Sequence, residues 1–130
     1  NADGWQLSNP SILGMAPLRS SLALFDEVGM AALRAKSLRL TGYLREILEH
    51  ETPRSVEILT PASDEAHGCQ LSLRLGEGAR SAVDRLEEAG VIADFREPDI
   101  LRVAPAPLYN RFHEVWRFVQ ILAGREDPGA

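Results

Sequence analysis

Arg102 is the residue whose type and setting best suit chemistry in this chain. It lies in a predicted strand, Ile100 to Ala104, where Leu101 and Val103 flank it. If those two apolar side chains face a core, the guanidinium projects from the opposite face of the sheet. The fork of donors on an arginine suits a carboxylate, and a proline-rich stretch directly after the strand would hold it firmly. Two interpretations stay open: a carboxylate ligand, or a surface arginine that pairs with Asp94, Glu97 or Asp99.

The other reactive side chains do not form a complete site. Lys36 is the only lysine among 14 basic residues, and it lies in a predicted helix beside arginines. A Schiff-base lysine needs a desolvating pocket that lowers its pKa, so we expect Lys36 to be an ordinary solvated residue. The three histidines and Cys69 lack the spacing of metal ligands, and no phosphate-binding glycine loop is present. We therefore expect no metal site and no catalytic residue in this chain.

Length and composition limit the classes of protein to which the chain can belong. It has 130 residues, of which 45% are hydrophobic and 25% charged, which suits one folded domain. The net charge of -5 argues against binding to nucleic acid. No apolar run approaches the roughly 18 to 20 residues that would cross a bilayer. The single cysteine excludes an intrachain disulfide and fits a cytoplasmic location.

Hydrophobic spacing predicts four helices and four short strands. The helices are expected from Leu13 or Pro17 to Glu27, from Met30 to His50, from Ala79 to Ala89, and from a cap at Asn110 to Leu122. The strands are expected at Val56 to Thr60, Gln70 to Leu75, Val91 to Phe95 and Ile100 to Ala104. A hairpin-like pair on each side of a helix predicts an α+β fold, with a small mostly antiparallel sheet and helices packed on one face.

Alternation within the second strand predicts two different faces for the sheet. Leu71, Leu73 and Leu75 should face the core, whereas the residues between them are polar. We expect the polar face to be the one that carries Arg102. The first residues, up to Ser11, show no periodicity and are expected to be extended.

Three stretches of the chain resemble kynureninase. They are GWQLSNP at 4–10, SLRLTGYL at 37–44 and RVAPAPLYN at 102–110, the last followed by Phe112 and His113. A fourth, HGCQL at 67–71, is similar to the RGCQL that is usual in the family. The resemblance covers about Gly4 to Leu122. It implies the C-terminal small domain of a fold-type-I pyridoxal-phosphate enzyme.

The resemblance also implies a division of the chain. Residues 1–12 would be a lead-in from a missing large domain, 13–124 the small domain, and 125–130 a frayed tail. Asn1 and Ala2 could be left over from an expression tag. The large domain of the same chain would be the main partner, and the full-length protein would be a homodimer that binds neither nucleic acid nor membrane.

The activity that the resemblance implies is the hydrolysis of L-kynurenine to anthranilate and L-alanine, in tryptophan catabolism. Pyridoxal 5'-phosphate would serve as the electron sink, held mainly by the large domain, which also carries the Schiff-base lysine. Arg102 matches the arginine that holds the α-carboxylate of the substrate. Asn9 matches an asparagine that reaches the cofactor-substrate site. The isolated chain is accordingly expected to be inactive.

Two alternatives differ from this interpretation. One is a stand-alone α+β module that binds small molecules without chemistry. The other is the small domain of a different fold-type-I enzyme, such as a desulfurase or an aminotransferase. The sequence contexts of Asn9 and Arg102 favour kynureninase over these enzymes.

Overall fold

The chain divides into two compact units in a computed structural model that describes residues 2–5, 7–52 and 56–125. The first unit ends at Leu33 and the second begins at Arg34, within the first turns of one long helix. The tail expected at 125–130 lies, apart from Arg125, outside the described residues.

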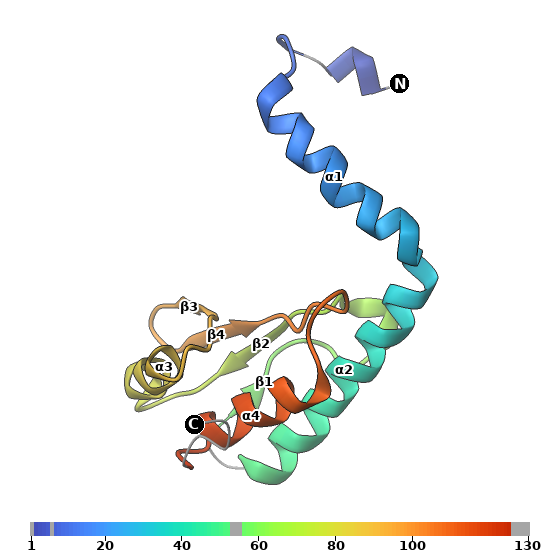
Figure 1. The fold of residues 1–130 in the computed structure, drawn as a ribbon. Helices are drawn as coiled ribbons and strands as arrows, with labels where there is room; N and C mark the ends of the chain where they lie inside the picture. Colours follow the sequence, from blue (N-terminus) through green and yellow to red (C-terminus); the bar gives the residue numbers. More distant parts are fainter. Residues whose placement is uncertain (1, 6, 53–55, 126–130) are drawn as a thin grey trace. The chain divides into compact units, whose positions relative to one another are not determined.

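The first unit consists of a short 3-10 helix, Ala2–Trp5, and the helix α1, Ile12–Val28 (Figure 1). The 3-10 turn lies where we expected an extended lead-in. Ser11 caps α1, because its hydroxyl accepts a hydrogen bond from the backbone N–H of Gly14 at 3.3 Å. Gly29 follows α1 with a positive φ of 81°, which suits glycine and ends the helix. No residue of α1 is buried.

The second unit confirms the α+β fold. Its helices are α2, Met30–Glu51, which begins in the first unit, α3, Ala79–Glu88, and α4, Phe112–Leu122, with a 3-10 turn at Asp64–Ala66. Its strands are β1, Glu57–Ile58, β2, Leu71–Arg74, β3, Asp94–Arg96, and β4, Ile100–Val103. They form one antiparallel sheet in the order β1-β2-β4-β3 (Figure 1).

One face of the sheet packs against the helices, as the alternation predicts. Leu71, Leu73 and Leu101 are completely buried, and Leu75 and Val103 nearly so. The same core includes side chains from all three helices: Leu40, Leu44 and Leu48 from α2, Val83 and Leu86 from α3, and Val115, Phe118 and Val119 from α4. The opposite face of β2 and β4 is polar and partly open to solvent.

The first strand is shorter than predicted because hydrogen bonds of a different kind replace the ladder at its end. Only Glu57 and Ile58 pair with β2 in strand register. Beyond them the Leu59 N–H still bonds to the Ser72 carbonyl at 2.8 Å, but the Ser72 N–H donates to the hydroxyl of Thr60. A side chain therefore takes the place of a backbone acceptor, and the regular strand ends.

The third strand lies later in the sequence than predicted. Val91 was expected to begin it, but its N–H donates to the Leu86 carbonyl at 2.8 Å and closes the end of α3. The residues up to Ala93 then connect α3 to the sheet, and pairing with β4 begins at Asp94. Val91 and Ala93 of this connection pack against the core without pairing in a strand, whereas Ile92 is exposed.

The cap of α4 also differs from the prediction. Arg111, not Asn110, is the N-cap residue, and α4 begins at Phe112. The side-chain oxygen of Asn110 already accepts a hydrogen bond from the Ala106 N–H at 2.7 Å, so it serves the preceding turn instead. Among the described residues, no helix is both long and apolar enough to cross a membrane.

Candidate functional site

Three neighbouring strands position Arg102. In the sheet it lies opposite Ser72 of β2 on one side and opposite Asp94 of β3 on the other. Its neighbours in β4, Leu101 and Val103, point into the core, so its side chain leaves the sheet on the polar face, as predicted. That side chain is 37% exposed, which leaves the guanidinium accessible from solvent.

Two polar side chains hold the guanidinium of Arg102. Its Nη1 atom lies 3.0 Å from Oδ2 of Asp94, and its Nη2 atom donates to Oε1 of Gln70 at 2.9 Å. Asp94 is one of the three acidic partners that the sequence suggested for a surface ion pair. The structure therefore contains the ion pair with Asp94. This ion pair does not exclude a role as a carboxylate ligand, because each Nη of Arg102 carries a second hydrogen that these contacts leave available.

Ion pairs extend over the rest of this polar face. Arg74 pairs with Glu57 at 2.6 Å and approaches Asp99 at 4.0 Å, and Arg96 donates to Asp94 at 3.1 Å. Asp99 is 26% exposed and the other side chains are about half exposed or more, and exposed ion pairs add little to stability.

Asn9 belongs to the first unit, whereas Arg102 belongs to the second. It is exposed and lies in the non-helical segment between the 3-10 turn and α1. Its side chain is thus available for a contact outside the described residues. The role expected for Asn9 stays a prediction.

Lys36 has an environment that the sequence did not predict. Its side chain is half-buried, and its Nζ donates to the carbonyl of Pro107 at 2.7 Å. It connects α2 to the proline-rich stretch that follows Arg102, so the expectation of a fully solvated lysine was wrong. Lys36 is the only lysine of the chain, and it does not line the pocket described below, so these residues do not fit covalent attachment of a pyridoxal cofactor.

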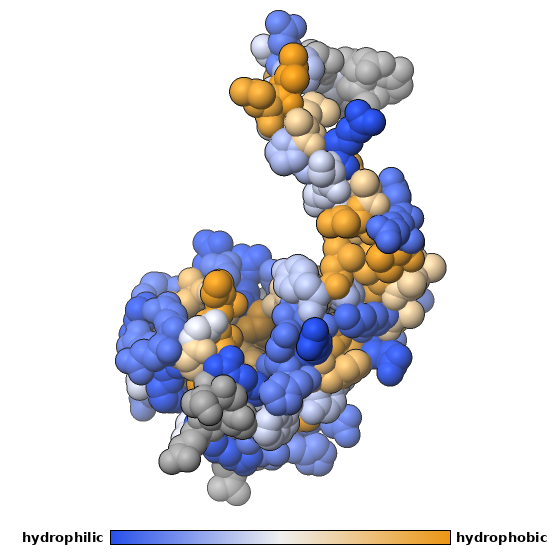
Figure 2. Space-filling view, in the orientation of Figure 1, coloured by the Kyte–Doolittle hydropathy of each residue, from blue (hydrophilic) through white to orange (hydrophobic). Residues whose placement is uncertain are grey.

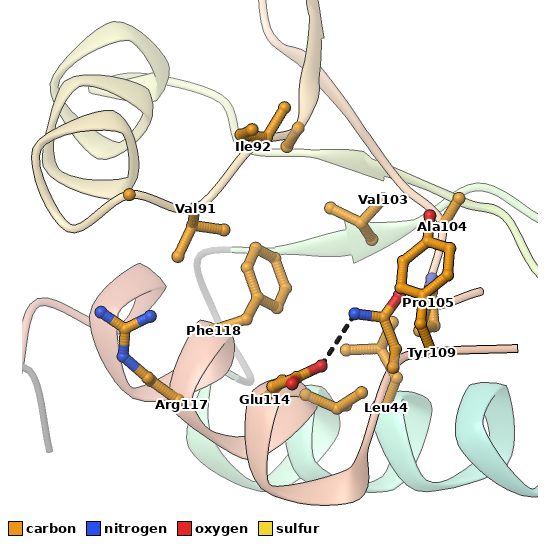
Figure 3. A pocket seen from close by; sticks show the side chains of 14 residues that line it. Leu44, Val91, Ile92, Val103, Ala104, Pro105, Tyr109, Glu114, Arg117 and Phe118 are labelled. Atoms are coloured by element: carbon orange, nitrogen blue, oxygen red, sulfur yellow. Dashed lines mark hydrogen bonds between the residues drawn. The ribbon is translucent and has the colours of Figure 1, made fainter. Parts of the chain in front are cut away.

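A pocket of about 590 Å³ lies on the helix side of the sheet (Figure 3). Val91, Ile92 and Phe118 form its apolar wall, and the ring of Tyr109 and the carboxylate of Glu114 lie at its polar side. Arg102 is not among the lining residues. The pocket was not predictable from the sequence, where the apolar residues from Val91 to Ala93 indicate a strand rather than the connection that lines it.

Glu114 is the titratable group with a perturbed environment in this pocket. Asn110 Nδ2 donates to its Oε2 at 2.8 Å, and the Arg111 N–H donates to the same oxygen at 3.1 Å. These two hydrogen bonds, the one from Asn110 above all, lower the pKa of the Glu114 carboxyl below its ordinary value. The spacing Asn-x-x-x-Glu at the start of a helix was the sequence signal for this contact.

Histidine, cysteine and acidic residues do not gather into a metal site in the part of the chain that the structure describes. Cys69 is half-buried two residues before β2, and Nδ1 of His67 lies 2.8 Å from the Gly68 carbonyl oxygen.

Comparison with known proteins gives one consistent result. Residues 33–122 match the family model of the kynureninase C-terminal domain. Over 122 residues, the chain is 54% identical to kynureninase of Xanthomonas euvesicatoria pv. vesicatoria (strain 85-10). The aligned residues make up 92% of this chain and 29% of that protein. Over 123 residues it is 56% identical to kynureninase of Myxococcus xanthus (strain DK1622). Here the aligned residues make up 95% of this chain and 29% of that protein.

The chain thus spans less than a third of the length of these curated relatives. The matched model accounts for most of the chain and begins at the same place as the second structural unit. The chain belongs to the kynureninase family and carries its C-terminal domain.

Proposed function

We propose that this chain is the C-terminal part of an enzyme that hydrolyses L-kynurenine to anthranilate and L-alanine, and that Arg102 holds the α-carboxylate of the substrate. The observation that carries the proposal is the setting of Arg102. Its guanidinium is accessible, lies on a polar sheet face and is held at both Nη atoms. An arginine with free N–H donors in a fixed plane matches the two oxygens of a carboxylate.

The cofactor of such an enzyme is pyridoxal 5'-phosphate, which withdraws electrons from the substrate when it is bound. The only lysine of this chain, Lys36, does not line the pocket of the second unit, so nothing in its setting marks it as the attachment site. We infer that the lysine belongs to the part of the protein that precedes this chain in the relatives. We also infer that Asn9 contributes to the cofactor-substrate site, which its exposure permits.

The partner in this proposal is the preceding large domain of the same polypeptide, and the full-length enzyme is a cytoplasmic homodimer. The chain covers 29% of the relatives, so a large domain accounts well for the remainder. The apolar surface of α1 supports a neighbour of this kind, because seven large hydrophobic residues of this helix are exposed.

Replacement of Arg102 in the full-length protein tests the proposal. Truncating one partner of a shielded charge pair costs about 2 to 5 kcal/mol. Arg102→Ala should therefore lower kcat/KM for L-kynurenine by about 25-fold to about 4000-fold, at 1.4 kcal/mol per decade. Arg102→Lys should recover part of this loss, because it keeps the charge without the planar fork.

The control for this experiment is cofactor content, measured by the absorbance of the bound pyridoxal group. It should not change in either variant, since the attachment site lies in the other domain. Arg102→Ala with wild-type kcat/KM, or with loss of cofactor and folding, would show that Arg102 is a structural residue.

The isolated chain should neither retain pyridoxal phosphate nor release anthranilate from L-kynurenine. The physical reason is that its single lysine, Lys36, does not line a pocket that could enclose the cofactor and lower the pKa of the amine. Borohydride trapping followed by mass spectrometry checks this expectation. A stoichiometric adduct at Lys36 together with turnover would contradict it.

A further inference from the structure

We propose that Asp94 and Gln70 are positioning residues for Arg102. They hold its guanidinium in the orientation in which it receives the substrate carboxylate. This inference rests on the proposed function of Arg102 and goes beyond it, because neither residue is assigned a role by the family resemblance.

The geometry of the three side chains supports this role. Arg102 lies in β4, and its two partners come from opposite sides: Asp94 begins β3, and Gln70 directly precedes β2. Asp94 contacts Nη1 at 3.0 Å, and Gln70 contacts Nη2 at 2.9 Å. Contacts at two atoms of a planar group fix both the direction of that group and its rotation about the side-chain axis. A single surface ion pair would leave the rotation free.

A guanidinium that is already ordered binds a ligand more tightly. A long side chain that becomes immobile only on binding loses conformational entropy, which lowers the affinity about two- to tenfold. Asp94 and Gln70 already immobilise the Arg102 side chain in the folded protein, before the substrate binds. The second hydrogen on each Nη, together with Nε–H, stays available for the carboxylate.

Asp94 carries the same charge as the ligand, so its repulsion must be compared with its positioning effect. Its Oδ2 atom also accepts a hydrogen bond from Nε of Arg96 at 3.1 Å, so two guanidinium groups share one carboxylate. The cluster therefore keeps a net positive charge toward an incoming anion. The Asp94 side chain is 48% exposed, and solvent at this level of exposure weakens the remaining repulsion. We therefore expect Asp94 to increase the affinity for the substrate by ordering Arg102 more than it decreases the affinity by repelling the substrate carboxylate.

Steady-state kinetics of the full-length protein test the inference. Asp94→Asn and Gln70→Ala should each raise KM for L-kynurenine about two- to fivefold, the range expected for a partly exposed charged contact, while kcat stays within about twofold. Glu57→Gln is the matched control, because it breaks the Arg74 ion pair on the same sheet face without contact to Arg102.

A second measurement separates positioning from a general structural role. In the Arg102→Ala background, Gln70→Ala should have no further effect on KM, because the side chain that it orients is gone. A residue that only stabilises the sheet would raise KM equally in both backgrounds, and that result would overturn the inference. An unchanged KM in both single variants would also overturn it. A lower KM in Asp94→Asn would do so too, since Asp94 would then be a competitor of the substrate.

The failure of the proposed function would look different. In that case Arg102→Ala itself would leave kcat/KM unchanged. If Arg102→Ala lowers kcat/KM and the Asp94 and Gln70 variants behave like Glu57→Gln, only the positioning role is wrong.

Discussion

Glu114 stabilises the start of α4 more strongly when it is ionised. Its carboxylate accepts hydrogen bonds from Asn110 and from the Arg111 N–H, and both favour the charged form. The pKa of Glu114 is therefore lower in the folded chain than in the unfolded chain. It follows that the contribution of Glu114 to stability is complete above the unfolded pKa, and is lost as the pH falls through the folded pKa.

Removing the first of these donors should reverse the shift. Asn110→Ala is expected to raise the pKa of Glu114 toward its ordinary value, because the hydrogen bond from Asn110 is the largest cause of the lowering. NMR titration of the Glu114 side-chain carboxyl carbon measures this. Tyr109→Phe, a change at an exposed neighbour, is the control and should leave the midpoint as it is. Equal midpoints in wild type and Asn110→Ala would contradict the assignment.

Individual side chains were predictable where a local pattern determines them. The alternation of Leu101, Arg102 and Val103 was enough to place the guanidinium on the polar face. The contact from Lys36 to Pro107 was not predictable, because the two residues are 71 positions apart and only the fold brings them together. Gln70 was missed as a partner of Arg102 for the same reason. Its proximity depends on the register between two strands.

At the level of elements, β4 is the centre of the second unit. It pairs with β2 on one side and β3 on the other, and Leu101 on its inner face is completely buried. Leu101→Ala should lower the free energy of unfolding by about 2 to 5 kcal/mol, through lost burial and the cavity that remains. Urea denaturation followed by circular dichroism measures the change.

Ile92→Ala is the matched control for this core substitution. Ile92 is also a large aliphatic residue of the second unit, but it is 99% exposed. Its truncation should change the free energy of unfolding by less than about 0.5 kcal/mol. Similar losses in the two variants would show that the burial of Leu101 contributes no more than an exposed side chain.

Helices with strong spacing signals and glycine ends were predictable to within a residue or two. Strand boundaries were less so, because a short apolar run can also pack without pairing. Val91 illustrates this point: it is apolar and follows a turn, yet its backbone closes α3 rather than joining β4. Thr60 shows how a strand ends, because just beyond β1 its hydroxyl replaces a backbone carbonyl as the acceptor for the Ser72 N–H. Whether a side chain or a backbone group accepts a hydrogen bond depends on the tertiary geometry.

At the level of the whole molecule, the division at residue 33 is the principal feature. The second unit begins at Arg34, and the family model of the C-terminal domain begins at residue 33. The relatives nevertheless align with more than nine-tenths of the chain, so α1 is part of their sequence too. The helix itself was predictable from its periodicity. Its lack of a buried face was not, because spacing reveals a helix but not what covers it.

The exposed apolar surface of α1 leads to the last prediction. Figure 2 shows hydrophobic residues gathered along this helix, and Leu13, Leu18 and Leu22 are each more than half exposed. A helix that is apolar around most of its circumference is normally buried. We expect the preceding domain of the full-length protein to cover α1, since the relatives are more than three times as long as this chain.

Hydrogen exchange followed by mass spectrometry distinguishes the possible neighbours. The amides of α1 should exchange quickly in the isolated chain at low concentration and at least about tenfold more slowly in the full-length protein, because a packed helix opens less often. Leu18→Asp in the full-length protein should remove much of this protection, whereas Ser20→Asp, on the same helix, should not. Equal exchange in the two proteins would contradict the prediction. Protection that appears in the isolated chain as its concentration rises would also contradict it, since a second copy would then be the neighbour that covers α1.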